Sequence, residues 1–397
     1  MKVSRRSHVP PFAVMEVLAA ANARRDAGES VLNLCAGEPA TGASDVVRRR
    51  AIDLLESGDL GYTEAMGVPA LRQAIAAHYG RTYGVDVDPA RVAVTTGSSG
   101  GFMLAFLAAF DAGDRVALAR PGYPAYRNIL AALGCEVVEL DCGPETRYQP
   151  TVSQLMAAYY EGGLDGLVIA SPANPTGTMI PPAELAALSA WCTDHDVRLI
   201  SDEIYHGIVY ADQASPAGET TTAAQYLDDG AVVVNSFSKY WAMTGWRLGW
   251  LLLPEDLVGA VDALAGNIAL SPPALAQHAG VAAFSPEGYA AAAENVARYA
   301  DSRSLVLDRL DDLGWDPVAP ADGAFYVYAN VAASGLDSVT WCERLLADTG
   351  VALTPGTDFD GVRGGEWVRL SFAAAPQVVA EAVDRIVAWR AAGCRRA

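Results

Sequence analysis

The stretch Asn235-Ser236-Phe237-Ser238-Lys239 decides the fold, and Gly245-Trp246-Arg247-Leu248-Gly249 follows it closely. The chain has 28 lysines and arginines, and only Lys2 and Lys239 are lysines. A desolvated ammonium can lose its proton and attack a carbonyl carbon, whereas a guanidinium stays protonated. We therefore expect Lys239 to perform chemistry that arginine could not, with water excluded by its aromatic neighbours Tyr240, Trp241 and Trp246.

The lysine follows a predicted strand. Residues 231–234 are continuously apolar, which indicates a buried strand. Ser236, Ser238 and Lys239 then fall on the turn after its C-terminal end, where open α/β sheets bind ligands. Two hydroxyls, an amine and Arg247 suit a ligand that carries both a phosphate and an aldehyde, and pyridoxal 5'-phosphate (PLP), which lysine holds as a Schiff base, fits that description. The alternative is a lone lysine on a solvated loop.

Length and composition indicate a folded protein of two domains. The chain has 397 residues, of which 51% are apolar and 19% charged, and this composition argues against disorder. No apolar run approaches the roughly 18 residues that a membrane helix needs, and the charged N-terminus is not followed by an apolar signal segment. We therefore predict a cytoplasmic protein without a membrane partner.

Charge and cysteine content exclude several partners. With 47 carboxylates against 28 cations, a basic surface for nucleic acid or acidic lipid is not expected. An anionic ligand must instead be held by specific arginines and backbone N–H groups. No zinc site, other metal site or redox pair is predicted, and reduced, mostly buried thiols are expected, because no CxxC spacing occurs among Cys35, Cys135, Cys142, Cys192, Cys342 and Cys394.

The pattern of short β-rich runs separated by helical stretches predicts an α/β fold. Strands are expected at 92–95, 115–119, 136–140, 166–170, 197–201, 231–234 and 248–253. Such alternation indicates a mainly parallel, doubly wound sheet, which we assign to a large domain of residues 45–285. The later chain favours helices at 255–264, 273–284, 286–313, 338–348 and 376–392, with strands at 325–328 and 367–371. A smaller α+β domain is therefore expected from residues 1–44 and 286–397.

Polar and glycine-rich turns follow several of these runs. Thr96-Gly97-Ser98-Ser99-Gly100-Gly101 opens a helix, where free N–H groups and the helix dipole favour an anion. This turn matches neither GxGxxG nor GxxxxGK[ST], so it predicts a phosphate seat of another kind, or a plain tight turn. Pro121 and Pro124 stiffen the loop around Tyr123, which would present its ring for stacking on a flat heterocycle.

Further candidates follow the next strands. Asn174 precedes Pro175, which leaves its amide able to donate to a ring oxygen. Asp202 ends an apolar strand, where an acid needs a cation such as a protonated pyridine nitrogen, although it could instead cap a following helix. Tyr205 would then reach the phenolate oxygen of the same ring.

Three residues outside these turns are also candidates. Tyr62 lies in a glycine-flanked loop, as a hydroxyl donor or as a ring packed on the neighbouring helix. Gly37 could bring bare backbone against a ligand or form a plain turn. Arg369 lies in an apolar strand-like run and needs an anion, either a substrate carboxylate or a structural salt bridge.

In this order the motifs resemble those of the class I/II aminotransferases of PLP fold type I, over nearly the whole chain. The resemblance implies that Lys239 is the Schiff-base lysine and proton shuttle, that Asp202 pairs with the pyridine nitrogen, and that Asn174 and Tyr205 donate to the ring oxygen. Tyr123 would stack on the ring. The phosphate would be held by Ser98, Ser99, Ser236, Ser238 and Arg247, with Tyr62 reaching in from the partner subunit of a homodimer.

The resemblance also implies a substrate site and a reaction. Gly37, Asn174 and Arg369 match the clamp for the substrate α-carboxylate, and the reaction moves an amino group from an amino acid to a 2-oxo acid. No arginine occurs between Arg247 and Arg298, where some dicarboxylate-specific relatives place a second carboxylate-binding arginine, so a neutral or aromatic donor is predicted. The alternatives are a PLP-dependent lyase or cyclase/synthase on the same scaffold, and a non-catalytic effector-binding domain.

Overall fold

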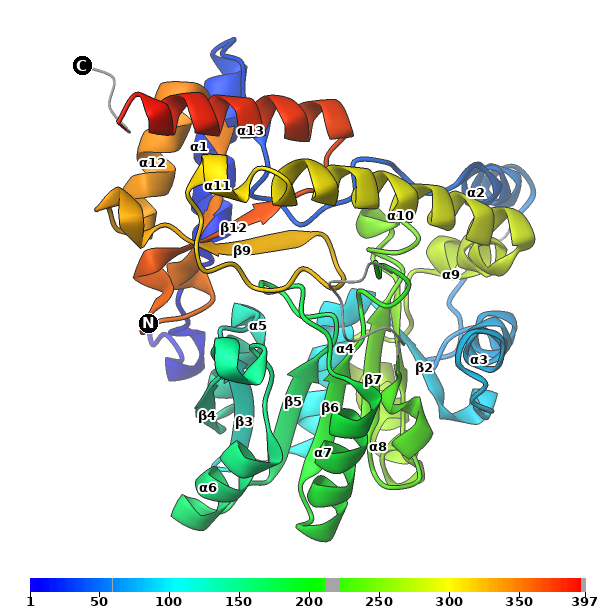
Figure 1. Cartoon of the computed structure of the whole chain (residues 1–397). Coiled ribbons are helices and arrows are strands. Elements are labelled where there is room, and N and C mark those ends of the chain that lie inside the picture. Colours follow the sequence, from blue (N-terminus) through cyan, green and yellow to red (C-terminus); the bar gives the residue numbers. More distant parts are fainter. Residues whose placement is uncertain (59, 211–220, 394–397) are drawn as a thin grey trace.

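The computed structural model describes residues 1–58, 60–210 and 221–393. Its centre is a seven-stranded sheet of order β2-β8-β7-β6-β5-β3-β4 (Figure 1). The strands are β2 (Val92–Thr95), β3 (Arg115–Arg120), β4 (Glu136–Asp141), β5 (Gly166–Ala170), β6 (Arg198–Asp202), β7 (Val232–Ser236) and β8 (Gly249–Leu252). Strand β8 runs antiparallel to β2 and β7, and the other neighbours are parallel. The predicted mainly parallel sheet is confirmed.

Helices cover both faces of this sheet. Alternate residues of β7 point to opposite cores: Val233 packs with α3 (Pro69–Tyr83), α6 (Val152–Gly162) and α7 (Pro182–Asp194), whereas Val232 and Val234 pack with the other core. That second core contains α4 (Gly97–Ala109), α5 (Pro124–Leu133) and α8 (Glu255–Ile268). Strands buried on both faces read as continuous apolar runs, which is why the sequence predicted them so well.

A second group of elements lies above the sheet in Figure 1. Its three-stranded antiparallel sheet has the order β11-β12-β9, formed by β9 (Tyr326–Asn330), β11 (Thr354–Pro355) and β12 (Trp367–Ser371). Near the N-terminus β1 (Leu32–Asn33) pairs in parallel with β10 (Val351–Ala352). The helices of this group are α1 (Ala13–Asp26), α10 (Pro286–Leu307), α11 (Leu310–Leu313), α12 (Ser338–Thr349) and α13 (Pro376–Ala391). The division at residues 45 and 286 stays a prediction.

Two helix expectations need correction. The helix expected at 286–313 divides at Arg309, whose backbone leaves helical geometry and whose side chain pairs with Asp384 on α13 at 3.1 Å. The helix expected at 273–284 is α9 (Ala274–Gly280) followed by a 3₁₀ turn, Val281–Phe284. In both places the apolar pattern continues through a change of backbone geometry, so the pattern alone does not reveal the break. Helix α2 spans Asp45–Ser57.

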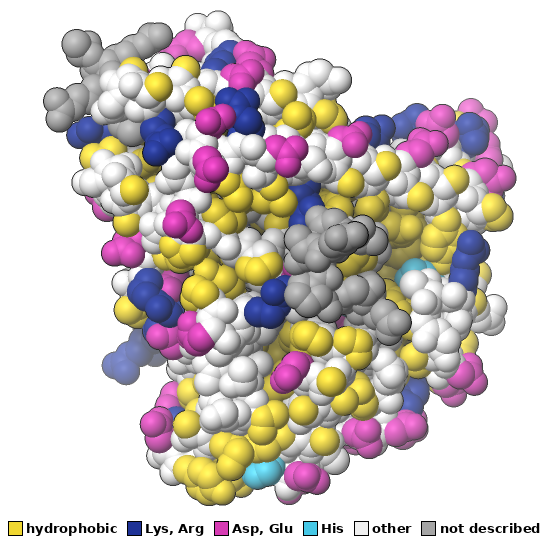
Figure 2. Space-filling view, viewed as in Figure 1, with side chains coloured by type: hydrophobic (Ala, Val, Ile, Leu, Met, Phe, Trp, Pro, Cys, Tyr) yellow, Lys and Arg dark blue, Asp and Glu magenta, His cyan; other side chains and the backbone are white. Residues whose placement is uncertain are grey.

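Charged side chains lie on the surface, and the described cysteines are buried. Figure 2 shows acidic and basic side chains interspersed among apolar ones on the face in view. Within the described part of the chain, no helix has both the length and the apolar character that crossing a bilayer requires. Cys35, Cys135, Cys142, Cys192 and Cys342 are free and buried, as expected, and Cys394 lies outside the described residues.

Candidate active site

The amine of Lys239 is enclosed at the carboxyl edge of the large sheet. Lys239 follows β7, and its Nζ donates a hydrogen bond of 2.6 Å to the carbonyl oxygen of Gly37. Burial lowers the pKa of Lys239 to about 8, and the positive charge of Arg369 acts in the same direction. A lysine with this pKa is partly neutral near neutral pH and can act as a nucleophile and base.

The rings beside this amine differ from those expected. Its Nζ lies 5.7 Å from the ring centroid of Tyr205 and 5.9 Å from that of Phe325. Trp241, expected as a neighbour, packs against Phe237 in the core beneath and donates its indole N–H to Ala283. A lysine side chain extends well past its own turn, so the residues near its end come from other elements and not from its sequence neighbours.

Asp202 lies at the end of β6 and is 3% exposed. The hydroxyl of Tyr126 donates to its Oδ2, and the backbone N–H of Ile204 donates to its Oδ1 at 3.1 Å. Burial raises the pKa of Asp202 to about 7 despite these hydrogen bonds. The alternative of a helix cap does not hold, because residues 204–207 form turns and no helix begins there. The buried acid therefore favours a cationic partner.

Tyr126 was not among the sequence candidates. It lies in the first turn of α5, three residues after Tyr123, so the loop already singled out for Tyr123 carried the signal. Spacing of three residues places both rings on one side of a helix, and their centroids are 5.4 Å apart.

Gly37, Tyr205 and Tyr326 form a compact group on the other side of the amine. The hydroxyls of Tyr205 and Tyr326 are 2.7 Å apart and both rings are buried. A Cβ at Gly37 would lie 1.9 Å from the Tyr326 hydroxyl oxygen. Glycine is required there because this close approach leaves no room for a side chain. Tyr326 was also missed, since nothing in its sequence context links it to residues 37 and 205.

A cup for an anion lies at the start of α4. The helix begins at Gly97, and the guanidinium of Arg247 lies against it, since a Cβ at Gly97 would come within 2.5 Å of an Arg247 nitrogen. Gly249 passes so closely behind that a Cβ there would lie 2.8 Å from the backbone nitrogen of Ser98. Ser98 is half-buried and Ser99 exposed in this first turn. A phosphate bound here would be stabilised by the free N–H groups of the helix start, by the helix dipole and by the guanidinium of Arg247.

The two serines before the lysine line the same edge. Ser236 Oγ and Ser238 Oγ are 2.9 Å apart, and Ser236 Oγ also lies 3.2 Å from the carbonyl oxygen of Leu248. Ser236 further accepts the backbone N–H of Ser238 at 3.0 Å. Ser236 thus has its hydrogen bonds largely met within the protein, so Ser238 is the better placed of the two to meet a ligand.

Arg369 is 4% exposed on β12. It donates to Asn174 Oδ1 at 2.8 Å and to the carbonyl oxygen of Cys35 at 2.6 Å. Its guanidinium carbon lies 4.5 Å from the Tyr326 ring centroid. Within the described residues no carboxylate pairs with Arg369, and its buried Nε has no hydrogen-bond partner. The salt-bridge alternative therefore lacks a partner there, and a bound carboxylate would satisfy the guanidinium.

Two tyrosines complete the set of candidates. Tyr123 immediately precedes α5, and its ring stacks on that of Phe12 at a centroid distance of 6.2 Å and an angle of 11°. Tyr62 is 86% exposed, so it does not pack on the neighbouring helix. Its role in the site of a partner subunit stays a prediction.

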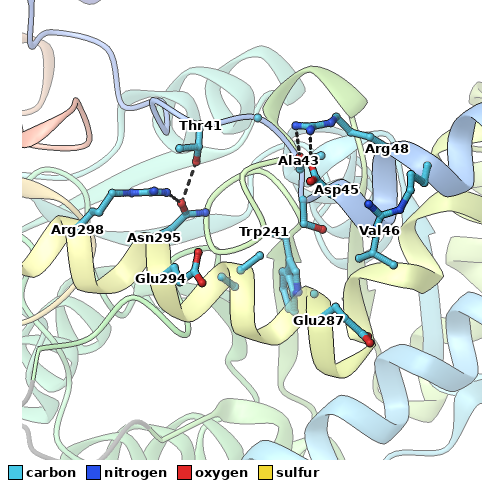
Figure 3. A pocket seen from close by; sticks show the side chains of 16 residues that line it. Thr41, Ala43, Asp45, Val46, Arg48, Trp241, Glu287, Glu294, Asn295 and Arg298 are labelled. Atoms are coloured by element: carbon cyan, nitrogen blue, oxygen red, sulfur yellow. Dashed lines mark hydrogen bonds and ion pairs between the residues drawn. The ribbon is translucent and has the colours of Figure 1, made fainter.

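A separate cavity lies between α2 and α10 (Figure 3). It measures about 500 Å³ and contains a hydrogen bond of 3.0 Å from Thr41 to Asn295, with Arg298 pointing at the same amide oxygen. Trp241 lines it, but none of the residues expected to bind the cofactor or the substrate does. We place the active site at the Lys239 cluster instead, because there an amine of lowered pKa, a buried acid and an anion cup lie together.

The residues of this cluster fit PLP. The cup at Gly97 suits its phosphate, the buried carboxyl of Asp202 suits a protonated ring nitrogen, and the enclosed amine of Lys239 suits its aldehyde. Arg369, for which no carboxylate partner is found among the described residues, suits the carboxylate of a substrate.

Comparison with known proteins identifies the family. The sequence model described as "Aminotransferase class I and II" matches residues 29–386. The chain belongs to the class I and II aminotransferases. Enzymes of this family are PLP-dependent transferases. The family and the fold expected from the sequence are confirmed.

Individual aminotransferases are similar over their whole length. A valine–pyruvate aminotransferase of Mycobacterium tuberculosis is 58% identical over 389 residues, which cover 98% of each chain. A crystal structure of an aminotransferase from Mycobacterium tuberculosis superposes with a TM-score of 0.95 at 57% identity, covering 99% of this chain and 100% of that one. The aspartate aminotransferase of Thermus thermophilus with maleate has a TM-score of 0.91 at 31% identity, covering 98% and 99%.

We expect Lys239 to become reactive at a lower pH than an ordinary lysine. Its pKa of about 8 means that the neutral amine prevails above pH 8 and the protonated amine below it. Trace labelling of the cofactor-free protein with acetic anhydride measures this directly, with Lys2 in the same digest reporting the reactivity of the reagent. Labelling of Lys239 should reach half its maximum near pH 8. A midpoint near the ordinary lysine value of about 10.4 would contradict the enclosed amine.

We expect Gly37→Ala to disrupt the site, because its new methyl group would collide with the Tyr326 hydroxyl. The free energy of unfolding should fall by about 1–3 kcal/mol, the usual cost of overpacking, and aminotransferase activity should fall at least about tenfold. Gly42→Ala is the matched control, since a Cβ there meets no atom within 4 Å. Equal denaturation midpoints and activities for the two variants would show that the approach of Tyr326 does not constrain the loop.

Proposed function

We propose that this protein transfers the amino group of a neutral L-amino acid, aliphatic or aromatic, to a 2-oxo acid with PLP as its cofactor. The observation that carries the proposal is the enclosed amine of Lys239, with its lowered pKa, between Asp202 and Arg369. The three residues would then act on the substrate and the cofactor together. The amine of Lys239 would act at the reacting carbon, Asp202 at the far end of the cofactor ring, and Arg369 on the substrate carboxylate.

Each residue has a definite task. PLP, when bound, supplies an electron sink for the bond being broken at the substrate Cα. Lys239 Nζ takes the Cα proton and returns it, which a partly neutral amine can do. The carboxyl group of Asp202, whose pKa is raised by burial, would pair with the ring nitrogen of the bound cofactor and keep that nitrogen protonated. Asn174 and Tyr205 would donate hydrogen bonds to the ring oxygen, and Tyr123 would cover the ring.

The substrate and the cofactor are each held through an anionic group, at opposite ends of the active site. Arg369 binds the α-carboxylate beside Asn174, with the backbone of Gly37 closing the clamp. The phosphate is held by the N-terminus of α4 and by the side chains of Ser98, Ser99, Ser236, Ser238 and Arg247. Two substrates use the site in turn, so the kinetics should be ping-pong.

Support for a neutral donor comes from the charges around the amine. Glu38, which accepts a hydrogen bond of 2.7 Å from Thr244, offsets part of the lowering of the Lys239 pKa, so its negative charge acts on the amine. The same charge would oppose a second carboxylate on the substrate. The similar Mycobacterium tuberculosis protein is named for valine and pyruvate. The Thermus thermophilus relative is named for aspartate, which makes a dicarboxylate donor the outcome to exclude.

We further propose a homodimer with shared active sites. Tyr62 lies in a region where apolar side chains are exposed, and Ala65 of the same loop approaches Gly266 near the end of α8. Apolar side chains are exposed on α2, in the loop after it and around the end of α8, namely Ile52, Leu55, Leu60, Ile268 and Leu270. A second copy covering this surface would give a mass in solution of twice 41.6 kDa.

A donor screen tests the proposed function. We expect the cofactor absorbance of the purified holoenzyme to change on adding valine, alanine or phenylalanine, with kcat/KM for the best neutral donor about tenfold or more above that for aspartate. Lys239→Ala should lose about 10²- to 10⁴-fold in rate, the usual contribution of a positioned base. Faster reaction with aspartate than with every neutral donor would refute the substrate class. Release of ammonia without amino transfer would indicate a lyase.

A further inference from the structure

Tyr326 contacts both the residue expected to bind the substrate carboxylate and a residue expected to bind the cofactor. It begins β9, is 1% exposed, and pairs in the antiparallel sheet with Ser371 of β12. Arg369 lies two residues before Ser371 on that strand, so its side chain is on the same face of the sheet as the side chain of Tyr326. The ring of Tyr326 therefore lies against the guanidinium of Arg369, whose carbon is 4.5 Å from the ring centroid.

The hydroxyl group of Tyr326 makes its hydrogen bond with Tyr205. The two oxygens are 2.7 Å apart, and the two rings meet at 79° with a centroid distance of 5.6 Å. Gly37 lies against the same hydroxyl, since a Cβ at this position would be 1.9 Å from the Tyr326 oxygen. Among the described residues, the Tyr326 hydroxyl has no hydrogen-bond partner other than Tyr205. Its proton is therefore available to Tyr205.

The direction of this hydrogen bond follows from the proposed task of Tyr205. A phenol has one O–H group that donates and an oxygen that can accept. If Tyr205 donates its proton to the ring oxygen of bound PLP, it can only accept the proton of Tyr326. A hydroxyl that accepts a hydrogen bond is polarised and becomes a stronger donor itself. Tyr326 would then strengthen the hydrogen bond that Tyr205 makes to the cofactor.

Tyr328, two residues further along β9, provides a contrast. It is also 1% exposed, but its buried hydroxyl has no hydrogen-bond partner among the described residues. Its ring stacks on Trp367 at a centroid distance of 4.8 Å. A buried tyrosine on this strand thus occurs with an unpaired hydroxyl, so burial alone does not explain why the hydroxyl of Tyr326 is paired.

We propose that Tyr326 is a positioning residue of the transfer reaction: its hydroxyl donates to Tyr205, so that Tyr205 donates strongly to the ring oxygen of the cofactor. This inference rests on the proposed function. The charged and titratable groups around the two tyrosines come from β12, the turn after β7, the end of β6 and the loop before α5, and they are Arg369, Lys239, Asp202 and Tyr123. Removal of the Tyr326 hydroxyl leaves all four in place, so its effect on the cofactor can be measured by itself.

The test titrates the visible absorbance of the lysine-bound cofactor in the holoenzyme of Tyr326→Phe. This variant loses the hydroxyl and keeps a ring against Arg369. A weaker hydrogen bond from Tyr205 leaves the ring oxygen less able to carry negative charge, so the cofactor should hold its proton to a higher pH. The midpoint should rise by about 0.3–1 pH unit, a two- to tenfold increase in proton affinity, as expected from one weakened hydrogen bond.

Two further variants separate this effect from a loss of packing. Tyr328→Phe is the matched control, since it removes a buried hydroxyl from the same strand, and it should leave the midpoint unchanged. If Tyr326 acts through Tyr205, adding Tyr326→Phe to Tyr205→Phe should not move the midpoint beyond that of Tyr205→Phe alone. Denaturation midpoints of the single variants show whether each is folded.

Substrate binding provides an independent readout. KM for valine should change less than about threefold in Tyr326→Phe, because this variant keeps an aromatic ring against Arg369. In Tyr326→Leu, which loses the ring as well, KM should rise by about three- to thirtyfold, the range expected for a desolvated cation–π contact.

The outcomes are distinct. A midpoint in Tyr326→Phe equal to that in Tyr328→Phe would overturn the inference and leave the proposed function standing. A further shift when Tyr326→Phe is added to Tyr205→Phe, or a rise in KM as large as that in Tyr326→Leu, would also overturn it. A wild type that binds PLP but transfers no amino group from any donor would overturn the proposed function, while the titration would still decide whether Tyr326 acts through Tyr205.

Discussion

The site depends on holding one amine out of water while leaving it without a carboxylate partner. Lys239 Nζ donates to a backbone carbonyl, that of Gly37, and Arg369 lies near enough to lower its pKa further. This contact joins the turn after β7 to the loop after β1. It requires glycine at position 37, because the Tyr326 hydroxyl occupies the space of a side chain and meets Tyr205 there. The burial that lowers the pKa of Lys239 therefore depends on the same close packing of Gly37 against Tyr326.

Arginine is used at two ends of the site in two different ways. Arg247 is exposed at the start of α4, where helix N–H groups share the charge of a phosphate. Arg369 is buried over the rings of Tyr326 and Phe359, where a carboxylate would lose its water and gain a strong ion pair. In a chain of formal charge −19, such local arrangements are needed to hold anions that the overall field repels. Lys239, the residue expected to transfer the proton, lies between these two arginines.

Most of the fold and much of the site could be predicted from the sequence. Buried parallel strands leave continuous apolar runs, and the polar residues after each run were expected at one edge, where Asn174, Asp202 and Lys239 indeed lie. The contacts of Tyr126, Tyr326 and Phe325 could not be predicted, since each is made with a residue distant in the sequence. Trp241 was misplaced for the opposite reason: adjacency in sequence suggested contact with the amine, whereas the turn directs its ring into the core.

The most direct test of the central claim is to find which residue holds the cofactor. The holoenzyme is reduced with borohydride, which makes the bond between a lysine and an aldehyde permanent, then digested, and the modified peptide is identified by mass spectrometry. One pyridoxyl group is expected, on Lys239. A group on Lys2, or its absence from a protein that binds PLP, would contradict it.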